Sequence, residues 1–507
     1  MIRETKVENG WLRGIAAADP RITAFKGIPF AAPPVGKNRW RAPQPCEDWE
    51  GIWDASRFAP ISVQDTPGIG DDIYIREWHV DSEIPMDEDC LYLNVWTGAK
   101  SKEEKLPVLV WFFGGGLQWG YPAEMEFDGE RLARRGVVVV SVNYRLNVFG
   151  FLAHPEITSE QPEAPANFGN LDQQAGIQWV VRNIAAFGGD PNNITIAGQS
   201  AGGGSVLSQM ACPKNAGLFQ KAVIMSAMIR SPYEEGGIGV PKPLREAEEN
   251  GKQFFDFLGA SNLEEARALD AFYIRDKYAE YAKTFPRMFG VLDGCFCVGD
   301  PLTMFLEGKC AGVSVMAGNT ADEFPSFIEA KNERELEDRA KELFAEKAET
   351  FLAFPETGDL VEEGKYAGVS GLECTSKALF SHTEKKNGQQ YYYYRFTPDI
   401  PGYDNPGTFH SCDLWFFFET LAKCWRPYVG HHYDLARKMC NYWANFIKTG
   451  DPNGLDADGS PMPEWKPYTK EAPCEMIFTS GGPVVSEEKE TPYKAFLIER
   501  VKEGLAK

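Results

Sequence analysis

The sequence predicts an α/β protein built on a central, mostly parallel β-sheet that is flanked by helices. Three observations lead to this class. Short runs of apolar and β-branched residues occur at 108–113, 194–196 and 313–317, and each runs into a glycine-containing turn. Apolar residues at helical spacing lie between these runs, and polar turns separate the segments. Continuous apolar runs are typical of parallel strands, because helices cover both faces of such a sheet.

Two segments carry the helical spacing, and we expect each to present one apolar face to the rest of the protein. The first segment leads into the run 194–196, and its face is marked by Leu171, Ala175, Gln178, Val181 and Ile184. The second lies near the C terminus, and its face is marked by Met439, Trp443, Phe446 and Ile447.

The domain organisation follows from where charge accumulates. The segments 230–300 and 325–390 carry more charge and less regular spacing than their surroundings. We interpret both as helical insertions that form a cap. The candidate catalytic residues are spread from 115 to 410, so one domain over residues 1–507 accounts for them more simply than several domains.

The run 194–196 leads into Gly198, Gln199, Ser200, Ala201 and Gly202. A serine on a tight turn between a strand and a helix has its hydroxyl lifted clear of the sheet. Only small neighbours fit beside it, because the backbone passes close. The five-residue pattern alone recurs by chance, so its context decides. With the motifs described below, the pattern predicts Ser200 as a nucleophile.

Three consecutive glycines, Gly114, Gly115 and Gly116, follow the run 108–113. Glycines at a strand end let backbone amides converge on one small anion. Acyl transfer needs such donors, because the former carbonyl oxygen becomes negatively charged in the tetrahedral intermediate. The alternative is phosphate binding, but the spacing fails G-x-G-x-x-G and no lysine follows as in a P-loop.

A serine nucleophile also needs a base and an acid. When the order along the chain is nucleophile, acid, histidine, four of the six histidines qualify: His382, His410, His431 and His432. His410 is the best placed, between a Pro-Gly loop and an aromatic run. We expect His382 at the surface. His431 and His432 are adjacent, so on a helix they point about 100° apart, and we interpret both as structural.

The acid should lie at the end of a strand between the nucleophile and the histidine. The run 313–317 and its turn lead to Asp322 and Glu323. Either carboxylate would orient the imidazole and stabilise its cationic form. Spacing alone does not choose between them.

The whole chain resembles the type B carboxylesterase family of the α/β-hydrolase fold. The stretch 187–202 is similar to the family's serine signature, and 88–96 is similar to its second signature. Further landmarks of the family are matched at 25–36, 143–152, 169–184 and 443–454. The resemblance implies the α/β-hydrolase fold and a Ser-His-Glu triad whose acid is Glu323. It also implies that the backbone amides of Gly115, Gly116 and Ala201 bind the oxyanion.

The sequence departs from the family pattern at two positions that bear on the site. Phe113 stands where the family usually has histidine, and we expect altered packing of the loop, since the oxyanion donors are backbone amides. Gln199 stands where cholinesterases carry glutamate, which removes a negative charge near the choline site. A cholinesterase is therefore not expected.

The predicted function is hydrolysis of neutral carboxylic esters, with short acyl chains or with aryl or bulky alcohols, through an acyl-enzyme and without metal or organic cofactor. One alternative is another acyl transfer on the same site, by an amidase, thioesterase or carbamate hydrolase. The other is a non-catalytic, neuroligin-like binding scaffold, which the complete set of triad residues disfavours. The substrate pocket is expected to include Leu117, Trp119, Gln199, Phe324, Trp415 and Phe416.

Charge and hydropathy bear on partners and location. The net charge is −21, from 52 basic and 73 acidic residues, and it repels nucleic acid and anionic membranes while favouring neutral or cationic ligands. The N terminus lacks the apolar segment of a signal peptide, and no apolar run approaches the roughly 18 residues of a membrane span. We therefore expect a cytoplasmic enzyme, either monomer or dimer, with no nucleic-acid or membrane partner.

Overall fold

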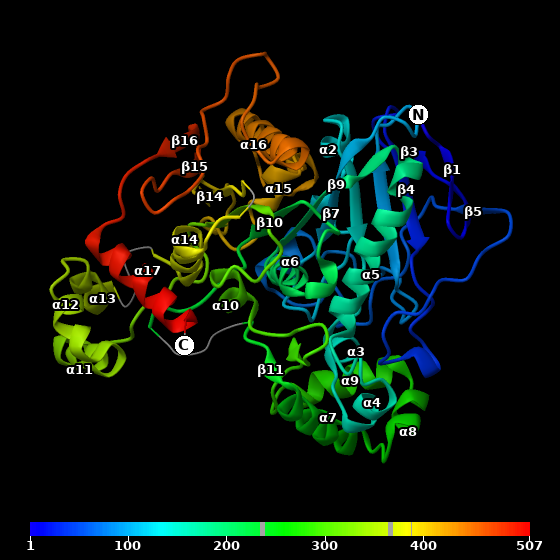
Figure 1. Cartoon of the computed structure of the whole chain (residues 1–507), viewed down its shortest axis with the longest axis horizontal. Helices are drawn as coiled ribbons and strands as arrows, with labels where there is room; N and C mark the ends of the chain where they lie inside the picture. The colour runs from blue at the N-terminus through cyan, green and yellow to red at the C-terminus, as the bar shows by residue number, and fades with distance from the viewer. Residues whose placement is uncertain (234–238, 364–368, 387, 507) are drawn as a thin grey trace.

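A single large sheet crosses the molecule. Within residues 1–233, 239–363, 369–386 and 388–506, which the computed structural model describes, eleven strands form this sheet (Figure 1). In spatial order they are β16 (Gly482–Ser486), β15 (Glu475–Thr479), β14 (Tyr391–Phe396), β13 (Ser314–Thr320), β10 (Lys221–Met225), β9 (Gly189–Gln199), β7 (Leu106–Phe112), β8 (Val138–Val142), β6 (Tyr92–Thr97), β4 (Thr23–Pro29) and β3 (Ile15–Ala16).

Neighbouring strands are parallel from β15 to β8. At the two edges, β16 on one side and β6, β4 and β3 on the other add antiparallel pairings. The predicted class, a mostly parallel sheet flanked by helices, is confirmed. Two small sheets lie outside it, one of β1 (Glu4–Val7), β2 (Gly10–Arg13) and β5 (Ile52–Asp54) and one of β11 (Lys242–Pro243) and β12 (Val291–Leu292).

The helices surround the sheet (Figure 1). Their bounds are α1 (Ile73–Glu77), α2 (Glu130–Arg134), α3 (Asn147–Phe151), α4 (Pro155–Glu160), α5 (Phe168–Asn183), α6 (Ala201–Ala211), α7 (Leu244–Leu258), α8 (Leu263–Ala268), α9 (Ala271–Tyr281), α10 (Pro301–Leu306), α11 (Glu333–Phe344), α12 (Ala348–Leu352), α13 (Thr357–Glu363), α14 (Gly371–His382), α15 (Leu414–Phe417), α16 (Gly430–Thr449) and α17 (Pro492–Leu505). Short 3-10 helices lie at Gly36–Asn38, Met125–Phe127, Ile184–Phe187, Pro213–Asn215, Ala345–Lys347 and Leu421–Lys423.

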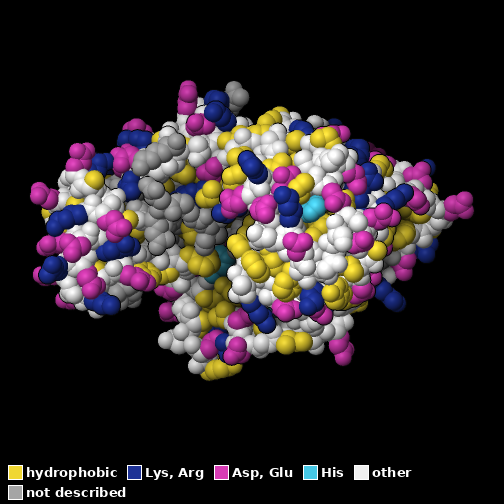
Figure 2. Space-filling view, turned by 90° about the horizontal axis from the view of Figure 1, so that it is seen from below, with side chains coloured by type: hydrophobic (Ala, Val, Ile, Leu, Met, Phe, Trp, Pro, Cys, Tyr) yellow, Lys and Arg dark blue, Asp and Glu magenta, His cyan; other side chains and the backbone are white. Residues whose placement is uncertain are grey.

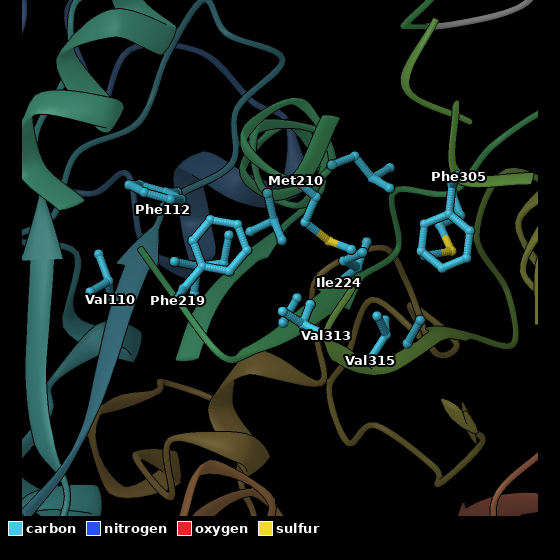
Figure 3. Close-up of a cluster of buried hydrophobic side chains, with 14 of the residues drawn as sticks. Val110, Phe112, Met210, Phe219, Ile224, Phe305, Val313 and Val315 are labelled. Carbon is cyan, nitrogen blue, oxygen red and sulfur yellow. The ribbon is translucent and has the colours of Figure 1, made fainter. Parts of the chain in front are cut away.

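The sheet separates two hydrophobic clusters, and alternate residues of one strand contribute to each. On β7, Val108 and Val110 belong to the cluster that includes residues of α5, α6 and α14. Leu109 and Trp111 belong to the cluster on the other face, with residues of α2, α15 and α16. Figure 3 shows part of the first cluster, where side chains from β7, β10, β13 and α6 converge. Helices on both faces thus explain why the strands are apolar throughout.

Helix α16, near the C terminus, buries the predicted face, Met439, Trp443, Phe446 and Ile447. The prediction for the face at α5 is right at one position and wrong at four. Ile184, just after α5, is buried, whereas Leu171, Ala175, Gln178 and Val181 are only half-buried and the opposite side of the helix is packed inside.

The buried side of α5 mixes apolar residues, among them Ile177, Trp179 and Val180, with polar and small ones. Asp172 binds Arg145 at 2.6 Å, and Gln173 donates to Ser205 Oγ at 2.9 Å. A Cβ on Gly176 would lie 2.7 Å from Val142, so the helix approaches the sheet more closely than a side chain would allow. Apolar spacing does not reveal buried polar residues that have hydrogen-bond partners, nor a glycine at a close contact.

The two predicted insertions pack at different places. Helices α7 to α9 share a hydrophobic cluster with residues of α3 and α4, whereas α11 and α12 lie beside α17 at one end of the molecule (Figure 1). Residues 234–238, 364–368 and 387, which belong to the predicted ranges 230–300 and 325–390, lie outside the described residues. Seen from the side of α7 to α9, the surface has a hollow in which hydrophobic side chains gather (Figure 2). No helix in the described part of the chain is both long and apolar enough to cross a membrane.

Candidate active site

Ser200 lies on the tight turn between β9 and α6. Its backbone has φ 54° and ψ −127°, a conformation that is rare for residues with a side chain. Two glycines permit the turn. A Cβ on Gly198 would lie 2.3 Å from the carbonyl oxygen of Gly202, and one on Gly202 would lie 2.1 Å from that of Phe112. The amide of Ser200 donates to Met225 O at 2.9 Å, which ties the turn to β10. Ser200 is therefore held in a fixed place at the carboxyl end of the parallel strands.

The glycine loop leaves β7 and passes beside Ser200. A Cβ on Gly114 would lie 3.1 Å from the Cβ of Ser200. Gly115 and Gly116 have φ of +103° and +62°, and the carbonyl of Gly115 accepts from the amides at 118 and 119. None of the backbone hydrogen bonds recorded for the described residues uses the amide of Gly115, Gly116 or Ala201. The three predicted donors are thus uncommitted and lie on segments that meet at Ser200.

His410 and Glu323 are in direct contact, Nδ1 to Oε2. Glu323 follows β13 and is almost completely buried, and His410 lies in the loop before α15. The other carboxylate oxygen accepts from the hydroxyl of Ser226 and from the amide of Thr320, both at 2.6 Å. Three donors therefore hold the Glu323 carboxylate, and one of them is the imidazole.

Asp322, the alternative acid, turns away from the imidazole. Its side chain is exposed, and Oδ2 accepts from both the amide and the hydroxyl of Thr408 at 2.8 Å. Asp322 therefore fixes the loop that carries His410. Of the two carboxylates that the spacing left open, the structure places Glu323 on the histidine.

The other imidazole nitrogen contacts Gln199. The distance from Gln199 Nε2 to His410 Nε2 is 3.2 Å. The side-chain amide nitrogen of Gln199 can only donate, so His410 Nε2 must be the acceptor. The proton of the neutral imidazole is therefore on Nδ1, which donates it to Glu323. A general base in this tautomer has the lone pair it needs. Gln199 is buried beside this lone pair, and a serine hydroxyl would have to displace its amide to bond there.

The remaining predicted pocket residues divide into two groups. Phe324 is 46% exposed and its ring lies 4.5 Å from that of His410, while Leu117 and Trp119, which follow the glycine loop, are half-buried. Trp415 and Phe416 have no exposed surface and lie in the hydrophobic core, contrary to the prediction. The short helix α15 turns them inward, so that Trp415 donates to Glu77 and Phe416 packs on Phe396.

The other histidines are away from this pair. His382 is half-buried rather than at the surface, and its Nε2 lies 2.7 Å from a carboxylate oxygen of Glu499. His432 is buried, and its two nitrogens bond the backbone of Val429 and Asp399. The ring of His431 lies 4.0 Å from that of His432, and the two rings are tilted by 35°.

Comparison with known proteins identifies the family. The family model described as carboxylesterase family matches residues 2–363 and 368–495. The chain belongs to the carboxylesterase family. It is 32% identical over 473 residues to fumonisin B1 esterase of Sphingopyxis macrogoltabida, covering 89% of this chain and 83% of that one. Over 493 residues it is also 32% identical to cocaine esterase of Oryctolagus cuniculus, covering 89% and 88%.

Solved structures agree with this family. A carboxylesterase of Geobacillus stearothermophilus matches with a TM-score of 0.75 and 28% identity, covering 97% of this chain and 99% of that one. A PNB esterase matches with a TM-score of 0.78 and 28% identity, covering 98% and 99%. The α/β-hydrolase fold and the carboxylesterase class predicted from the sequence are confirmed, and esters are the substrates that this class implies.

This carboxylesterase has a second buried carboxyl group near the candidate triad, which the sequence reasoning missed. Asp413 is fully buried; Tyr394 donates to its Oδ2 at 2.8 Å, and Oδ1 has no partner among the described residues. Burial and the negative charge of Glu323 raise the pKa of Asp413 to about 7. Below this pH Asp413 is protonated and adds no negative charge beside the contact between His410 and Glu323. Its place in the apolar segment 412–418 gave no sequence signal.

We expect Asp413 to make stability depend on pH. In the unfolded chain an aspartate titrates near pH 4, so between about pH 4 and 7 only the folded state keeps this proton. Relative to the Asp413→Asn variant, the wild-type free energy of unfolding should therefore fall as pH rises through this window. The fall should reach at most about 4 kcal/mol, from about three pKa units at 1.4 kcal/mol each. Urea unfolding at pH 5 and pH 8 covers about two of these three units and should therefore show up to about 3 kcal/mol of this fall.

The exposed Asp276, which is 68% accessible, gives a matched control. Asp276→Asn should follow the wild-type pH dependence. The explanation is wrong if the Asp413→Asn and wild-type proteins lose the same stability between the two pH values.

Proposed function

We propose that this carboxylesterase is a serine hydrolase that works through an acyl-enzyme, with Ser200, His410 and Glu323 as its catalytic triad. The contact between His410 and Glu323, beside the strained turn that bears Ser200, is the observation that carries the proposal. A base that is oriented by a buried carboxylate next to a serine on such a turn is the arrangement that activates a hydroxyl.

The reaction proceeds in two steps. His410 Nε2 takes the hydroxyl proton of Ser200 as the oxygen attacks the ester carbonyl, and the amides of Gly115, Gly116 and Ala201 donate to the oxyanion. His410 then gives the proton to the departing alcohol. Water attacks the acyl-enzyme in the same manner and releases the acid. Glu323 stabilises the imidazolium that forms in each step.

We further propose that the insertion with α7 to α9 forms one wall of the substrate site. Its residue Met288 accepts a hydrogen bond at 3.0 Å from Gln118, which lies in the segment following the glycine loop. Phe324, exposed beside His410, lies on another side. Neutral aryl esters with short acyl chains are the first substrates to test. The relatives named for hydrolysis of cocaine and fumonisin B1 support esters as the bond cleaved.

The test combines turnover with labelling. The wild-type protein should hydrolyse 4-nitrophenyl acetate and butyrate faster than the matching anilides. A fluorophosphonate should abolish this activity and add the mass of one adduct, which peptide mapping should place on Ser200. A folded protein with neither turnover nor adduct would refute the proposal, and faster cleavage of the anilides would make it an amidase.

A further inference from the structure

An indole ring is held against the glycine loop. The amide of Trp119 donates to Gly115 O at 3.0 Å, and its ring atom Cζ3 is 3.8 Å from where a Cβ on Gly116 would lie. The indole N–H donates to Asp65 Oδ2 at 3.1 Å. Backbone and side chain together therefore fix Trp119 next to the residues proposed to bind the oxyanion.

An arginine covers this indole. The Cζ atom of Arg287 lies 4.7 Å from the centre of the Trp119 ring, within the range of a cation–π interaction. The Arg287 side chain is exposed, and among the described residues no ion pair or hydrogen bond is recorded for its guanidinium. The carboxylate of Asp65 lies at the same indole, where it accepts from the ring nitrogen.

The backbone that carries Arg287 is anchored to the same segment as Trp119. The amide of the next residue, Met288, donates to the hydroxyl of Tyr278 at 2.8 Å, and its carbonyl accepts from Gln118 at 3.0 Å. Tyr278 in turn donates to Gln118 Oε1 at 3.1 Å. This closed set of hydrogen bonds sets the distance between the insertion and the glycine loop. The backbone next to Arg287 is thus held at the wall of the proposed site. The guanidinium itself makes no recorded ion pair or hydrogen bond with the described residues.

We propose that Arg287 binds a carboxylate carried by the substrate, so that this esterase accepts half-esters of dicarboxylic acids as well as neutral esters. The inference rests on the proposed function of the site. A guanidinium with uncommitted N–H groups binds a carboxylate in a bidentate manner, and stacking on an indole pre-orders it for this contact. The carboxylate would be joined to the ester carbonyl by a short carbon chain, because the Trp119 ring that Arg287 covers also lies against Gly116 of the glycine loop.

The net charge of −21 argues for neutral or cationic substrates, yet it acts at long range. At physiological salt the field of exposed charges is screened over about 8 Å, whereas a direct ion pair at the site is screened less. The carboxylate of a bound substrate would therefore respond mainly to the guanidinium that it contacts, and the overall charge only slows the approach of an anion.

The experiment compares two esters of equal acyl length, 4-nitrophenyl hexanoate and the mono-4-nitrophenyl ester of adipic acid, with the uncatalysed rates subtracted. Arg287→Gln should lower kcat/KM for the adipate half-ester by about tenfold, since hydrogen bonds between charged groups are worth about 1.5 kcal/mol or more. Hydrolysis of the hexanoate should be nearly unchanged. Arg287→Lys should retain part of the rate, as a point charge without the fork.

The matched control is Lys283→Gln, which removes the same charge from an exposed residue on the same segment. It should leave both rates close to wild type. The inference is overturned if this control lowers the adipate rate as much as Arg287→Gln, or if Arg287→Gln lowers both esters equally. If neither ester is hydrolysed and no fluorophosphonate adduct forms, the proposed function fails and the inference falls with it. Hydrolysis of hexanoate with an adipate rate indifferent to Arg287 overturns the inference alone.

Discussion

Replacing Glu323 with glutamine should lower kcat for ester hydrolysis by about 10³- to 10⁴-fold, the loss known for an amide in place of a triad carboxylate. The Glu323 carboxylate accepts hydrogen bonds from three donors, which belong to His410, Ser226 and Thr320. An amide has only one accepting oxygen, so its nitrogen must face one of these donors. It also lacks the charge that stabilises the imidazolium. Steady-state kinetics with 4-nitrophenyl butyrate, beside thermal unfolding of both proteins, measure the effect.

Asp322→Asn is the matched comparison, one residue away. Its exposed carboxylate accepts from Thr408 and supports the loop of His410 without contacting the imidazole. The amide oxygen of asparagine still accepts from that residue, so we expect a loss of about tenfold or less, consistent with two weakened surface hydrogen bonds. The acid is Asp322 instead if the order of the two losses is reversed.

The elements that the sequence predicted well are those whose chemistry is local. The turn at Ser200 needs small residues within two positions of the serine, and the glycine loop follows its strand directly, so both are visible as short patterns. The histidine and the acid were found by their order along the chain. Choosing Glu323 over Asp322 needed the family resemblance, because both carboxylates follow the same strand and only the fold of the loop at Thr408 separates them.

The errors come from features that depend on tertiary contacts. The buried side of α5 includes polar residues beside its apolar ones, and Asp172 and Gln173 are paired with residues distant in sequence, so apolar spacing alone did not locate this side. Trp415 and Phe416 lie near the histidine in sequence, but α15 turns them into the core. The contact between Gln199 and His410 joins residues 211 positions apart.

Gly115→Ala should lower kcat by at least about 10²- to 10³-fold, the cost of losing one oxyanion donor. A methyl group at this position would lie 2.2 Å from the carbonyl oxygen of Trp119, and φ is +103°, which side chains rarely adopt. The loop must therefore shift, and the amides of Gly115 and Gly116, which we propose as oxyanion donors, shift with it. KM should change less than kcat, because the oxyanion forms only after binding.

Two further glycine-to-alanine substitutions provide comparisons in which the added methyl group meets less steric conflict. A Cβ on Gly116 meets nothing closer than 3.8 Å, so Gly116→Ala carries only the backbone strain of φ +62° and should lose less activity than Gly115→Ala. Gly204→Ala, in α6 with open space around its Cβ, should keep wild-type kcat and gain about 0.5–1 kcal/mol in unfolding free energy. Circular dichroism and thermal unfolding establish that each variant is folded. A folded Gly115→Ala protein with wild-type kcat would show that the amides of this loop do not bind the oxyanion.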